Sequence, residues 1–214
     1  FFNDTATTEI YTSLFVGSAD VYKRQRNAHV ADCGTHGILN LGAKTLRLSD
    51  SLIERFVASG VRAGDGSTIV RTTVQAGGSN GSAVDAAIGC GRGCLVQNCV
   101  VTGNGGNGIR TGVLAHVIEN QLDQNGSTAI GALDGSTLSR NTVGAATFSG
   151  GLSTGISCTE GCGVFDNVIR NAGPALSLGG PSSVYGRNVI SFHGGVASGT
   201  GTSAGDNFCD GTQC

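Results

Sequence analysis

A repeat of roughly 20 to 27 residues runs through most of this 214-residue chain and limits the folds that it can adopt. Residues 155–171, GISCTEGCGVFDNVIRN, show the unit in full: an apolar opening residue, a turn, an apolar strand and an Asn. A second aligned position follows each opening residue after about 10 to 12 residues, and this nearly constant offset indicates a true repeat. The opening residues are Ile38, Val61, Ile88, Ile109, Ile130, Ile156 and Leu176.

The units are too short for most repeat architectures. A βαβ crossover needs about 30 residues, and no unit has the apolar periodicity of a helix. A single coil of short strands cannot bury its own apolar face, whereas stacked coils share a continuous core. The sequence therefore predicts an all-β solenoid, a parallel β-helix of about seven coils with Gly and Asn at its corners.

An Asn recurs at the second aligned position of the later units. Val164 and Asn167 are three residues apart, whereas a flat strand alternates with period two, so the chain bends at this point. Asn tolerates left-handed backbone angles, and its amide can both donate to and accept from a coil about 4.8 Å away. We predict a buried ladder in which Asp50 and Thr72 hold the same place in the first two units. Its Asn members are Asn98, Asn120, Asn141, Asn167 and Asn188.

A second corner carries Gly in its second position, which is typical of a turn. We interpret Asp65 and Asp134 as turn residues and not as catalytic groups, because each directly precedes this Gly. The dipeptides at this corner are Asp65-Gly66, Arg92-Gly93, Asp134-Gly135 and Glu160-Gly161.

Eight cysteines favour an oxidising compartment. Two C-x3-C pairs hold equivalent repeat positions across the second corner, where Cα atoms can approach to the roughly 5.5 Å that a disulfide needs. A zinc site made from both pairs would span about 14 Å, far beyond a zinc–sulfur distance of about 2.3 Å. Cys33 and Cys99 lie about three coils apart, so a bond between them is not expected. The predicted disulfides are Cys90–Cys94, Cys158–Cys162 and, in a C-terminal cap, Cys209–Cys214.

Charge and hydropathy argue against several classes of function. The net charge is -2, which provides no basic surface for nucleic acid. No apolar run approaches the roughly 18 residues that span a bilayer, so no membrane insertion is expected. No metal or cofactor motif is present, and the four His are scattered over different coils. No signal peptide is visible, but the cysteines favour an extracellular or cell-surface location.

The two ends of the chain differ from the repeats. Residues 1–25, FFNDTATTEIYTSLFVGSADVYKRQ, contain a single Gly and resemble a translated sequencing adapter. We therefore expect this segment to be foreign to the fold. The predicted organisation is a β-helix over 26–191, followed by a disulfide-bonded cap over 192–214.

The repeat, in the form N-x-φ-x-x-N-x-x-G-φ over 98–109 and similarly from Asn167 to Leu176, resembles the right-handed parallel β-helix superfamily of pectate-lyase-like proteins. The resemblance covers about 37–191, and the ending GDNFCDGTQC resembles that of bacterial secreted members. It implies a right-handed solenoid. The superfamily contains lyases, hydrolases, epimerases, tailspikes and noncatalytic surface proteins, so the fold alone does not select an activity.

Charged residues precede the corner Asn in successive units. A surface salt-bridge ladder, worth about 0–1 kcal/mol per pair, is one interpretation, and a strip that contacts a glycan is the other. Glu119 and Asp166 would lie about 10 Å apart, at or beyond the 6.5–9.5 Å of an inverting carboxylate pair. Arg71 and Gln97 would begin this column. The candidate glycan contacts are Glu119, Arg140, Asp166 and Arg187, with Asp123 and Arg170 in a neighbouring column.

Two functional hypotheses follow. The aspartate motifs of polygalacturonase-like members are absent. The outward-facing positions that directly follow the opening apolar residues include Arg62 and Arg110, and they contain no acidic cluster that could bind calcium. We therefore expect a secreted, noncatalytic β-helix domain that binds polysaccharide or acts at a cell surface. The alternative is a C-terminal fragment of a polysaccharide lyase or glycoside hydrolase whose catalytic coils lie upstream.

Overall fold

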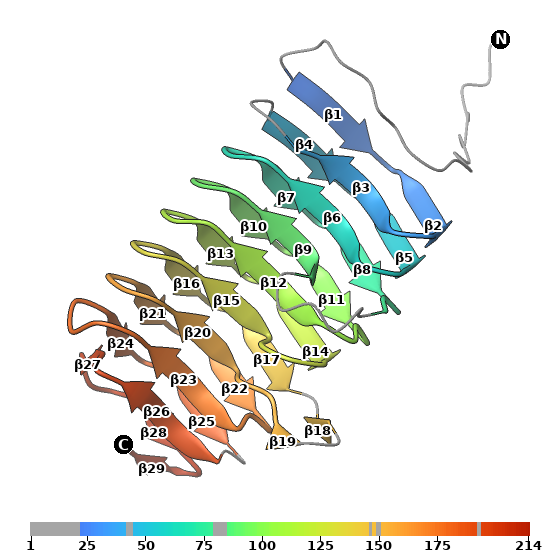
Figure 1. The fold of residues 1–214 in the computed structure, drawn as a ribbon. Helices are drawn as coiled ribbons and strands as arrows, with labels where there is room; N and C mark the ends of the chain where they lie inside the picture. The colour runs from blue at the N-terminus through green and yellow to red at the C-terminus, as the bar shows by residue number, and fades with distance from the viewer. Residues whose placement is uncertain (1–21, 42–44, 79–84, 146, 149–150, 192–193) are drawn as a thin grey trace, which may run out of the picture.

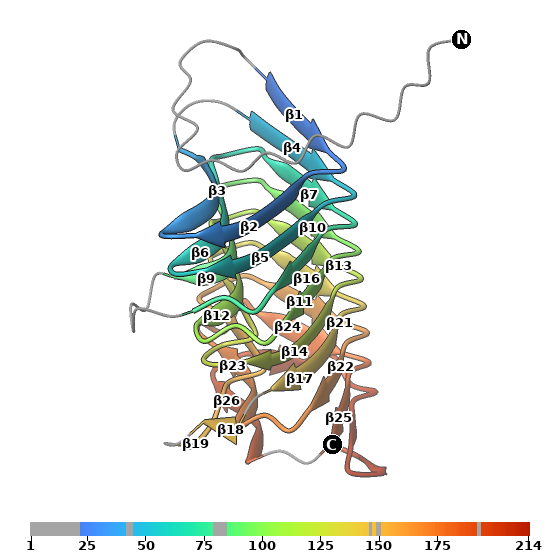
Figure 2. The same cartoon turned by 90° about the vertical axis from the view of Figure 1, so that its right-hand side faces the viewer.

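A computed structural model describes residues 22–41, 45–78, 85–145, 147–148, 151–191 and 194–214. Within these ranges the chain contains strands and no helix, and it winds into a β-solenoid of about eight turns (Figure 1). Successive strands of one turn join three different parallel sheets, which we name A, B and C. Figure 2 views the solenoid from the side of sheet B. The predicted all-β solenoid is confirmed.

Each sheet runs along the solenoid axis. Sheet A contains β1 (Tyr22–Arg26), β4 (Thr45–Ser49), β7 (Thr68–Val70), β10 (Leu95–Gln97), β13 (His116–Ile118), β16 (Thr137–Ser139), β21 (Gly163–Phe165), β24 (Val184–Gly186) and β27 (Thr202–Ser203). Sheet B contains β2 (His29–Cys33), β5 (Leu52–Phe56), β8 (Thr73–Gln75), β11 (Val100–Thr102), β14 (Gln121–Asn125), β17 (Thr142–Ala145), β22 (Val168–Arg170), β25 (Val189–Ser191), β28 (Phe208–Cys209) and β29 (Thr212–Gln213). Sheet C contains β3 (His36–Asn40), β6 (Ser59–Ala63), β9 (Ala86–Cys90), β12 (Asn107–Thr111), β15 (Ile130–Ala132), β20 (Ile156–Cys158), β23 (Pro174–Leu178) and β26 (Gly195–Gly199).

Two antiparallel pairs interrupt this pattern. The strands β18 (Thr147–Phe148) and β19 (Gly151–Leu152) form a small hairpin between sheets B and C. At the C-terminal end, β29 pairs with β28, and the Cys209–Cys214 disulfide joins this hairpin to the end of the chain. The edge of sheet B at this end is therefore the two-residue strand β29, and such a short edge limits pairing with another chain.

Stacked apolar side chains of the three sheets form one core. On sheet A, for example, Val96, Val117 and Leu138 occupy the same position in successive coils and are fully buried. This register repeats because each unit has an apolar residue at the same inward-facing position. As a result, neighbouring coils bury one another's apolar surface.

An Asn ladder lies buried beside the corner between sheets A and B. The side-chain amide of Asn120 donates to Asn141 Oδ1 at 3.0 Å, and the same contact joins Asn141 to Asn167 at 3.0 Å. Each Oδ1 also accepts a backbone N–H from the preceding coil, which satisfies buried polar groups. The complete ladder is Asn120, Asn141, Asn167, Asn188 and Asn207.

The predicted start of this ladder is wrong by one residue. Asn98 is exposed and has φ of 54°, and Cys99 takes the ladder position, where its N–H donates to Asn120 Oδ1 at 2.9 Å. Asp50 likewise lies one position outside the ladder, and the buried Ser51 replaces it. Asn suits two neighbouring positions at this corner. At one position its side-chain amide is buried in the ladder, and at the other its backbone is left-handed. The presence of Asn alone therefore does not show which of the two positions belongs to the ladder. Thr72 lies in the ladder position as predicted.

The corner between sheets C and A is the predicted glycine turn. Asp65 Oδ1 accepts the N–H of Arg92 at 2.8 Å, and Asp134 bonds the hydroxyl of Thr159 in the next coil, so both aspartates are turn residues. All four predicted glycines at this corner, Gly66, Gly93, Gly135 and Gly161, have φ between 62° and 67°. The three predicted disulfides are confirmed: Cys90–Cys94, Cys158–Cys162 and Cys209–Cys214, with Cα separations of 6.3, 6.4 and 5.6 Å. Cys33 and Cys99 are free thiols.

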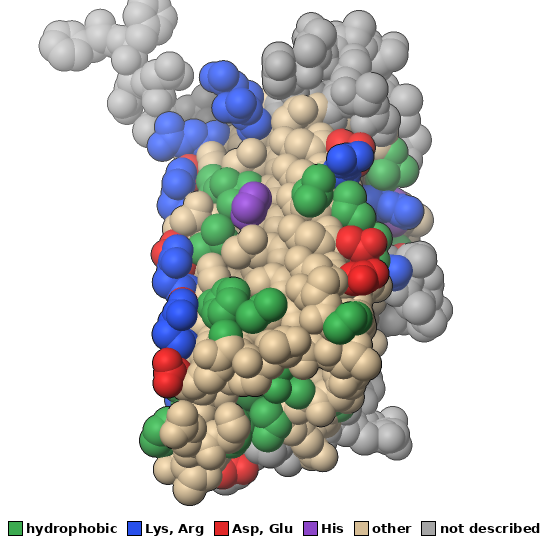
Figure 3. Space-filling view, turned by 90° about the vertical axis from the view of Figure 1, so that its left-hand side faces the viewer, with side chains coloured by type: hydrophobic (Ala, Val, Ile, Leu, Met, Phe, Trp, Pro, Cys, Tyr) green, Lys and Arg blue, Asp and Glu red, His purple; other side chains and the backbone are tan. Residues whose placement is uncertain are grey.

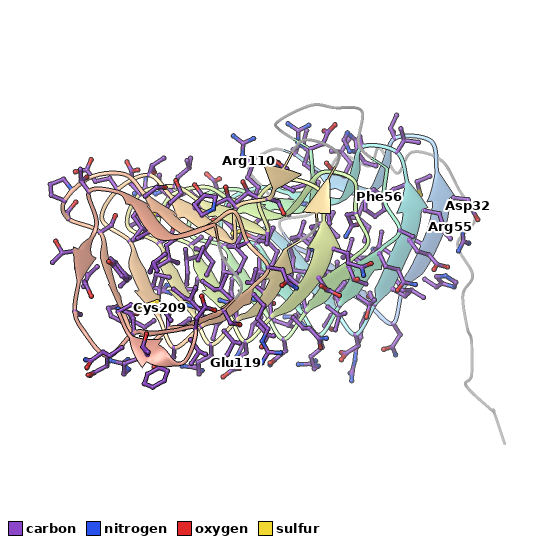
Figure 4. The ribbon with its side chains drawn as sticks, turned by 90° about the horizontal axis from the view of Figure 1, so that it is seen from below. Asp32, Arg55, Phe56, Arg110, Glu119 and Cys209 are labelled. Atoms are coloured by element: carbon purple, nitrogen blue, oxygen red, sulfur yellow. A yellow bond between two sulfur atoms is a disulfide. The ribbon has the colours of Figure 1, made fainter. Side chains whose placement is uncertain are left out.

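The corner between sheets B and C contains a shorter, unpredicted amide pair. Asn104 donates to Asn125 Oδ1 at 2.9 Å, and both residues are buried. Phe56 fills the same region nearer the N-terminal end, where its ring lies over Gly77. Figure 4 shows Phe56 beside Arg55, which lies near Asp32 at that end of the solenoid.

Strands extend beyond both predicted boundaries of the solenoid. β1 begins at Tyr22, inside the segment 1–25, and pairs with β4 in register from Tyr22 to Arg26. At the other end, β26, β27 and β28 continue the three sheets beyond residue 191. The origin of residues 1–25 stays a prediction, and residues 1–21 lie outside the described part of the chain.

Candidate functional site along the corner between sheets A and B

A column of left-handed residues projects from the corner between sheets A and B, directly before the buried ladder. Its φ values lie between 46° and 59°. Such angles cost a non-Gly residue about 1–2 kcal/mol, but each turn is fixed by bonds between coils, such as Arg140 N–H to the Phe165 carbonyl at 3.2 Å. We call this the corner column: Asn27, Asp50, Arg71, Asn98, Glu119, Arg140, Asp166, Arg187 and Asp206.

Opposite charges alternate along the corner column and pair between neighbouring coils (Figure 3). Arg187 makes a bidentate contact with Asp166, with Nε–Oδ1 at 2.7 Å and Nη2–Oδ2 at 3.0 Å. Arg140 Nε lies 2.9 Å from Glu119 Oε1. Four of the predicted glycan contacts therefore form two ion pairs with each other, as the salt-bridge interpretation predicts.

Arg71 continues the column toward the N-terminal end, where it bonds both carboxylate oxygens of Asp50 at 2.6 and 2.9 Å. Gln97 does not lie in this column as predicted. It is the last residue of β10, and Asn98 takes its place at the corner. From β10, the side chain of Gln97 donates to Glu119 Oε2 at 2.9 Å.

These contacts keep the carboxylates of the corner column ionised. Hydrogen bonds from Gln97 and then Arg140 lower the pKa of Glu119, and the hydrogen bond from Arg187 lowers the pKa of Asp166. A general acid of a glycosidase needs a raised pKa. Glu119 and Asp166 are also separated by the intervening rung that carries Arg140. The corner column therefore has the geometry and electrostatics of a structural ion-pair ladder.

Asp123 and Arg170 are the remaining predicted contacts, and they lie on the outer face of sheet B. The register pairs Asp123 with Gly144 and Gly144 with Arg170, so the two charged residues are two rungs, or about 10 Å, apart. Both side chains are exposed, and within the described residues neither makes a side-chain hydrogen bond or ion pair. A Cβ on Gly144 would clash with the Asp123 carboxylate, so the absence of a side chain lets this carboxylate lie over Gly144, on the side toward Arg170.

Phe165 is a neighbouring feature that the sequence analysis did not single out. It ends β21 on the outer face of sheet A and directly precedes Asp166 in the corner column. The guanidinium carbon of Arg187 lies 5.3 Å from the centroid of its ring. Two glycines in the sequence could have indicated the position of this ring, because they leave space for it. Gly163 lies on the same strand as Phe165, and Gly186 lies on the next strand of sheet A.

A second charged cluster lies on sheet B near the N-terminal end. Glu54 accepts a hydrogen bond from Gln75 at 3.0 Å and contacts His29 at 3.0 Å, and Arg55 joins Glu54 to Asp32. The pKa of Glu54 is lowered by these partners, Gln75 first. Across the described ranges, no three His, Cys, Asp or Glu side chains come together as a metal-binding group.

The outward row of sheet C is as predicted from the sequence. Arg62, Gly89 and Arg110 follow one another in register, and Gly131 and Ser157 continue the row. Figure 4 shows Arg110 and Glu119 on opposite sides of the solenoid. The described part of this row carries no carboxylate.

Among the described residues there is no helix of sufficient length and hydrophobicity to cross a bilayer. No protein-family model matches the chain, and no curated protein matches it.

Proposed function

We propose that this chain is an extracellular, noncatalytic β-solenoid that binds a glycan chain on the outer face of sheet B. One observation carries the proposal: Asp123 and Arg170 are exposed, without a side-chain partner among the described residues, and face solvent across Gly144. The corner column beside them is ion-paired. The side-chain acceptors of Asp123 and donors of Arg170 are therefore not used by other described residues and can bond a ligand.

The chemistry of this pair suits sugar hydroxyls. A carboxylate accepts two or more hydrogen bonds, and a guanidinium carries five N–H donors in a fixed plane. The rungs of a parallel sheet are about 4.8 Å apart, so Asp123 and Arg170 can contact neighbouring parts of one extended ligand. Gln121 and Thr142, which are exposed on the same face, add further polar groups.

Two further features support the proposal. Three disulfides are compatible with an extracellular location. The resemblance of the repeat to pectate-lyase-like proteins supports polysaccharide as the ligand class. The lowered pKa values of Glu119 and Asp166 favour binding over acid catalysis at the corner column.

Affinity electrophoresis in gels that contain polygalacturonate, xylan or β-glucan tests this proposal. We expect at least one polymer to retard the protein. Asp123→Asn and Arg170→Gln should each weaken binding about tenfold or more, because each removes charged hydrogen bonds worth about 1.5–3 kcal/mol. Asp134→Asn and Arg62→Gln are matched controls on other surfaces and should bind like the unmodified protein.

An assay for products separates this proposal from the enzymatic alternative. The protein is incubated with pectin or alginate and calcium. Unsaturated uronides, which a lyase releases, are measured by their absorbance, and new reducing ends, which a hydrolase also releases, are measured by a reducing-sugar assay. No release is expected. Release by the purified chain would contradict the noncatalytic proposal, and equal binding by the Asp123 and Arg170 variants would show that the ligand uses another surface.

A further inference from the structure

Phe165 occupies an unusual place on the outer face of sheet A. Its ring covers two glycines: a Cβ on Gly163 would lie 3.1 Å from Phe165 Cε2, and a Cβ on Gly186 would lie 3.4 Å from Phe165 Cε1. Gly163 is on the same strand, and Gly186 pairs with Phe165 on the next coil. The ring therefore spreads across two strands in space that side chains would otherwise fill, and it remains partly exposed.

Polar groups border this ring on the corner side. Arg187 lies over the ring, 5.3 Å from its centroid, while Nε and Nη2 bond Asp166. A guanidinium has five N–H donors, so donors remain beyond the two used here. The Asp166 carboxylate likewise has lone pairs beyond the two contacts with Arg187. An apolar ring thus lies beside a donor and an acceptor that are held in place.

The surrounding face is also suited to contact. Figure 3 shows hydrophobic side chains gathered on sheet A beside the alternating charges of the corner column. The partly exposed apolar residues that face outward there include Val70, Leu95, Ile118 and Val184. Aromatic rings gain energy from flat contacts over their faces, and a pyranose ring has one flat apolar face with hydroxyls at its rim.

We infer that Phe165, Asp166 and Arg187 form a second glycan subsite, in which the apolar face of a pyranose packs against the part of the Phe165 ring left exposed beside Arg187, and its hydroxyls bond the Arg187–Asp166 pair. This inference rests on the proposed glycan binding, and it adds a contact on the other side of the corner from Asp123 and Arg170. A sugar is favoured over an apolar peptide because charged donors and acceptors border the ring. A polymer that reaches both subsites gains affinity through effective concentration.

The chain contains no Trp, so a Phe165→Trp variant carries a single reporter at the proposed subsite. Titration with oligosaccharides of the retained polymer should shift the Trp emission of this variant to the blue and protect it from acrylamide quenching. Phe165→Ala should weaken polymer binding about 2- to 10-fold, as expected for loss of an aromatic stacking contact. Phe208→Trp, on the exposed C-terminal end of sheet B, is the control and should show no shift.

The outcomes separate the two proposals. If a polymer retards the protein and Asp123→Asn weakens binding, but Phe165→Trp emission and Phe165→Ala affinity do not change, the second subsite is refuted and the proposed function stands. If none of the three polymers retards the protein, both proposals are refuted for these glycans. Phe165→Trp keeps a large ring over the glycines, so its result does not depend on whether Phe165→Ala folds.

Discussion

At the scale of single residues, the Asn ladder shows how buried amides can specify a corner. Asn141 accepts the backbone N–H and side-chain amide of Asn120, and it donates to the Val117 carbonyl and to Asn167. Removal of this side chain would leave several buried groups without partners, and each such group costs about 1–3 kcal/mol. Asn98, one position outside the ladder, makes no such set of contacts in the exposed corner column.

We therefore predict that Asn141→Ala lowers the free energy of unfolding by about 2–4 kcal/mol, measured by urea denaturation. Asn98→Gly is the control, because Gly adopts the left-handed angle of this exposed position without strain. It should change the free energy of unfolding by less than about 0.5 kcal/mol. A loss at Asn98 as large as that at Asn141 would contradict the register of the ladder.

The ion pairs of the corner column make a second prediction at this scale. The hydrogen bond from Arg71 is the main cause that lowers the pKa of Asp50 from 3.8 to about 2. Because the folded pKa lies below the unfolded value, the stabilisation is complete above about pH 4 and is lost as the pH falls through about 2. Arg71→Gln should raise the pKa of Asp50 toward 3.8, as measured by carboxyl NMR titration.

Stability should follow the same pH window. Between pH 4 and 2, the free energy of unfolding should depend less on pH in Arg71→Gln than in the unmodified protein. The reason is that the folded and unfolded pKa values of Asp50 differ less in the variant. Added salt should reduce the difference, because the Arg71 side chain is exposed and Asp50 is only partly buried, so salt screens the pair. An unchanged Asp50 titration in the variant would show that Arg71 does not hold this carboxylate.

At the scale of strands and corners, the sequence predicted what depends on residue type and missed what depends on register. The glycine turns and all three disulfides were predictable, because Gly and cysteines only four or five positions apart act locally. The start of the ladder was misplaced, because Asn suits both the buried column and the left-handed column beside it. The Asn104–Asn125 pair and the position of Phe165 depend on which residues lie on neighbouring coils, so the linear repeat did not identify them.

The corner between sheets C and A also predicts where another disulfide fits. In the coil after Cys90–Cys94, the equivalent residues are Thr111 and Ala115. The hydroxyl of Thr111 is buried with no hydrogen-bond partner, so its removal sacrifices no hydrogen bond. The double substitution Thr111→Cys and Ala115→Cys should therefore form a fourth disulfide.

Oxidation of this variant should add about 2 kcal/mol to the free energy of unfolding, as estimated for closure of a loop of about five residues. Mass spectrometry after alkylation should find only the two native free thiols, Cys33 and Cys99. The same variant with dithiothreitol is the control for the oxidised form. Four alkylated thiols under oxidising conditions would mean that this coil does not bring the two positions together.

At the scale of the whole molecule, the stability of a solenoid is approximately a sum over coils and their interfaces. The continuous Asn ladder begins at Asn120, and the earlier coils place Ser51, Thr72 and Cys99 in its line. We therefore expect the coils from Asn120 onward to be more protected in hydrogen exchange than the earlier ones. The first residue that could extend the ladder is Cys99.

Cys99 already lies where a ladder amide would bond. Its Sγ is 3.6 Å from the Ile69 carbonyl and 3.4 Å from the Gln97 carbonyl. Asn167 Nδ2 bonds the equivalent carbonyls, that of Leu138 in the preceding coil and that of Phe165 in its own coil. Burial raises the pKa of the Cys99 thiol to about 11, so the group is neutral and donates only weakly at neutral pH. An amide at this position would replace weak contacts with full hydrogen bonds.

Cys99→Asn should therefore raise the free energy of unfolding by about 1 kcal/mol and increase hydrogen-exchange protection in the neighbouring coils. Its amide should donate to Asn120 Oδ1, as each ladder Asn does to the next coil. Cys99→Ser, which keeps the size but not the reach of the amide, is the matched control and should not extend protection. If Cys99→Asn destabilises the protein as much as Cys99→Ser, the core at this coil cannot accept another rung, and the ladder ends at Asn120 because of packing.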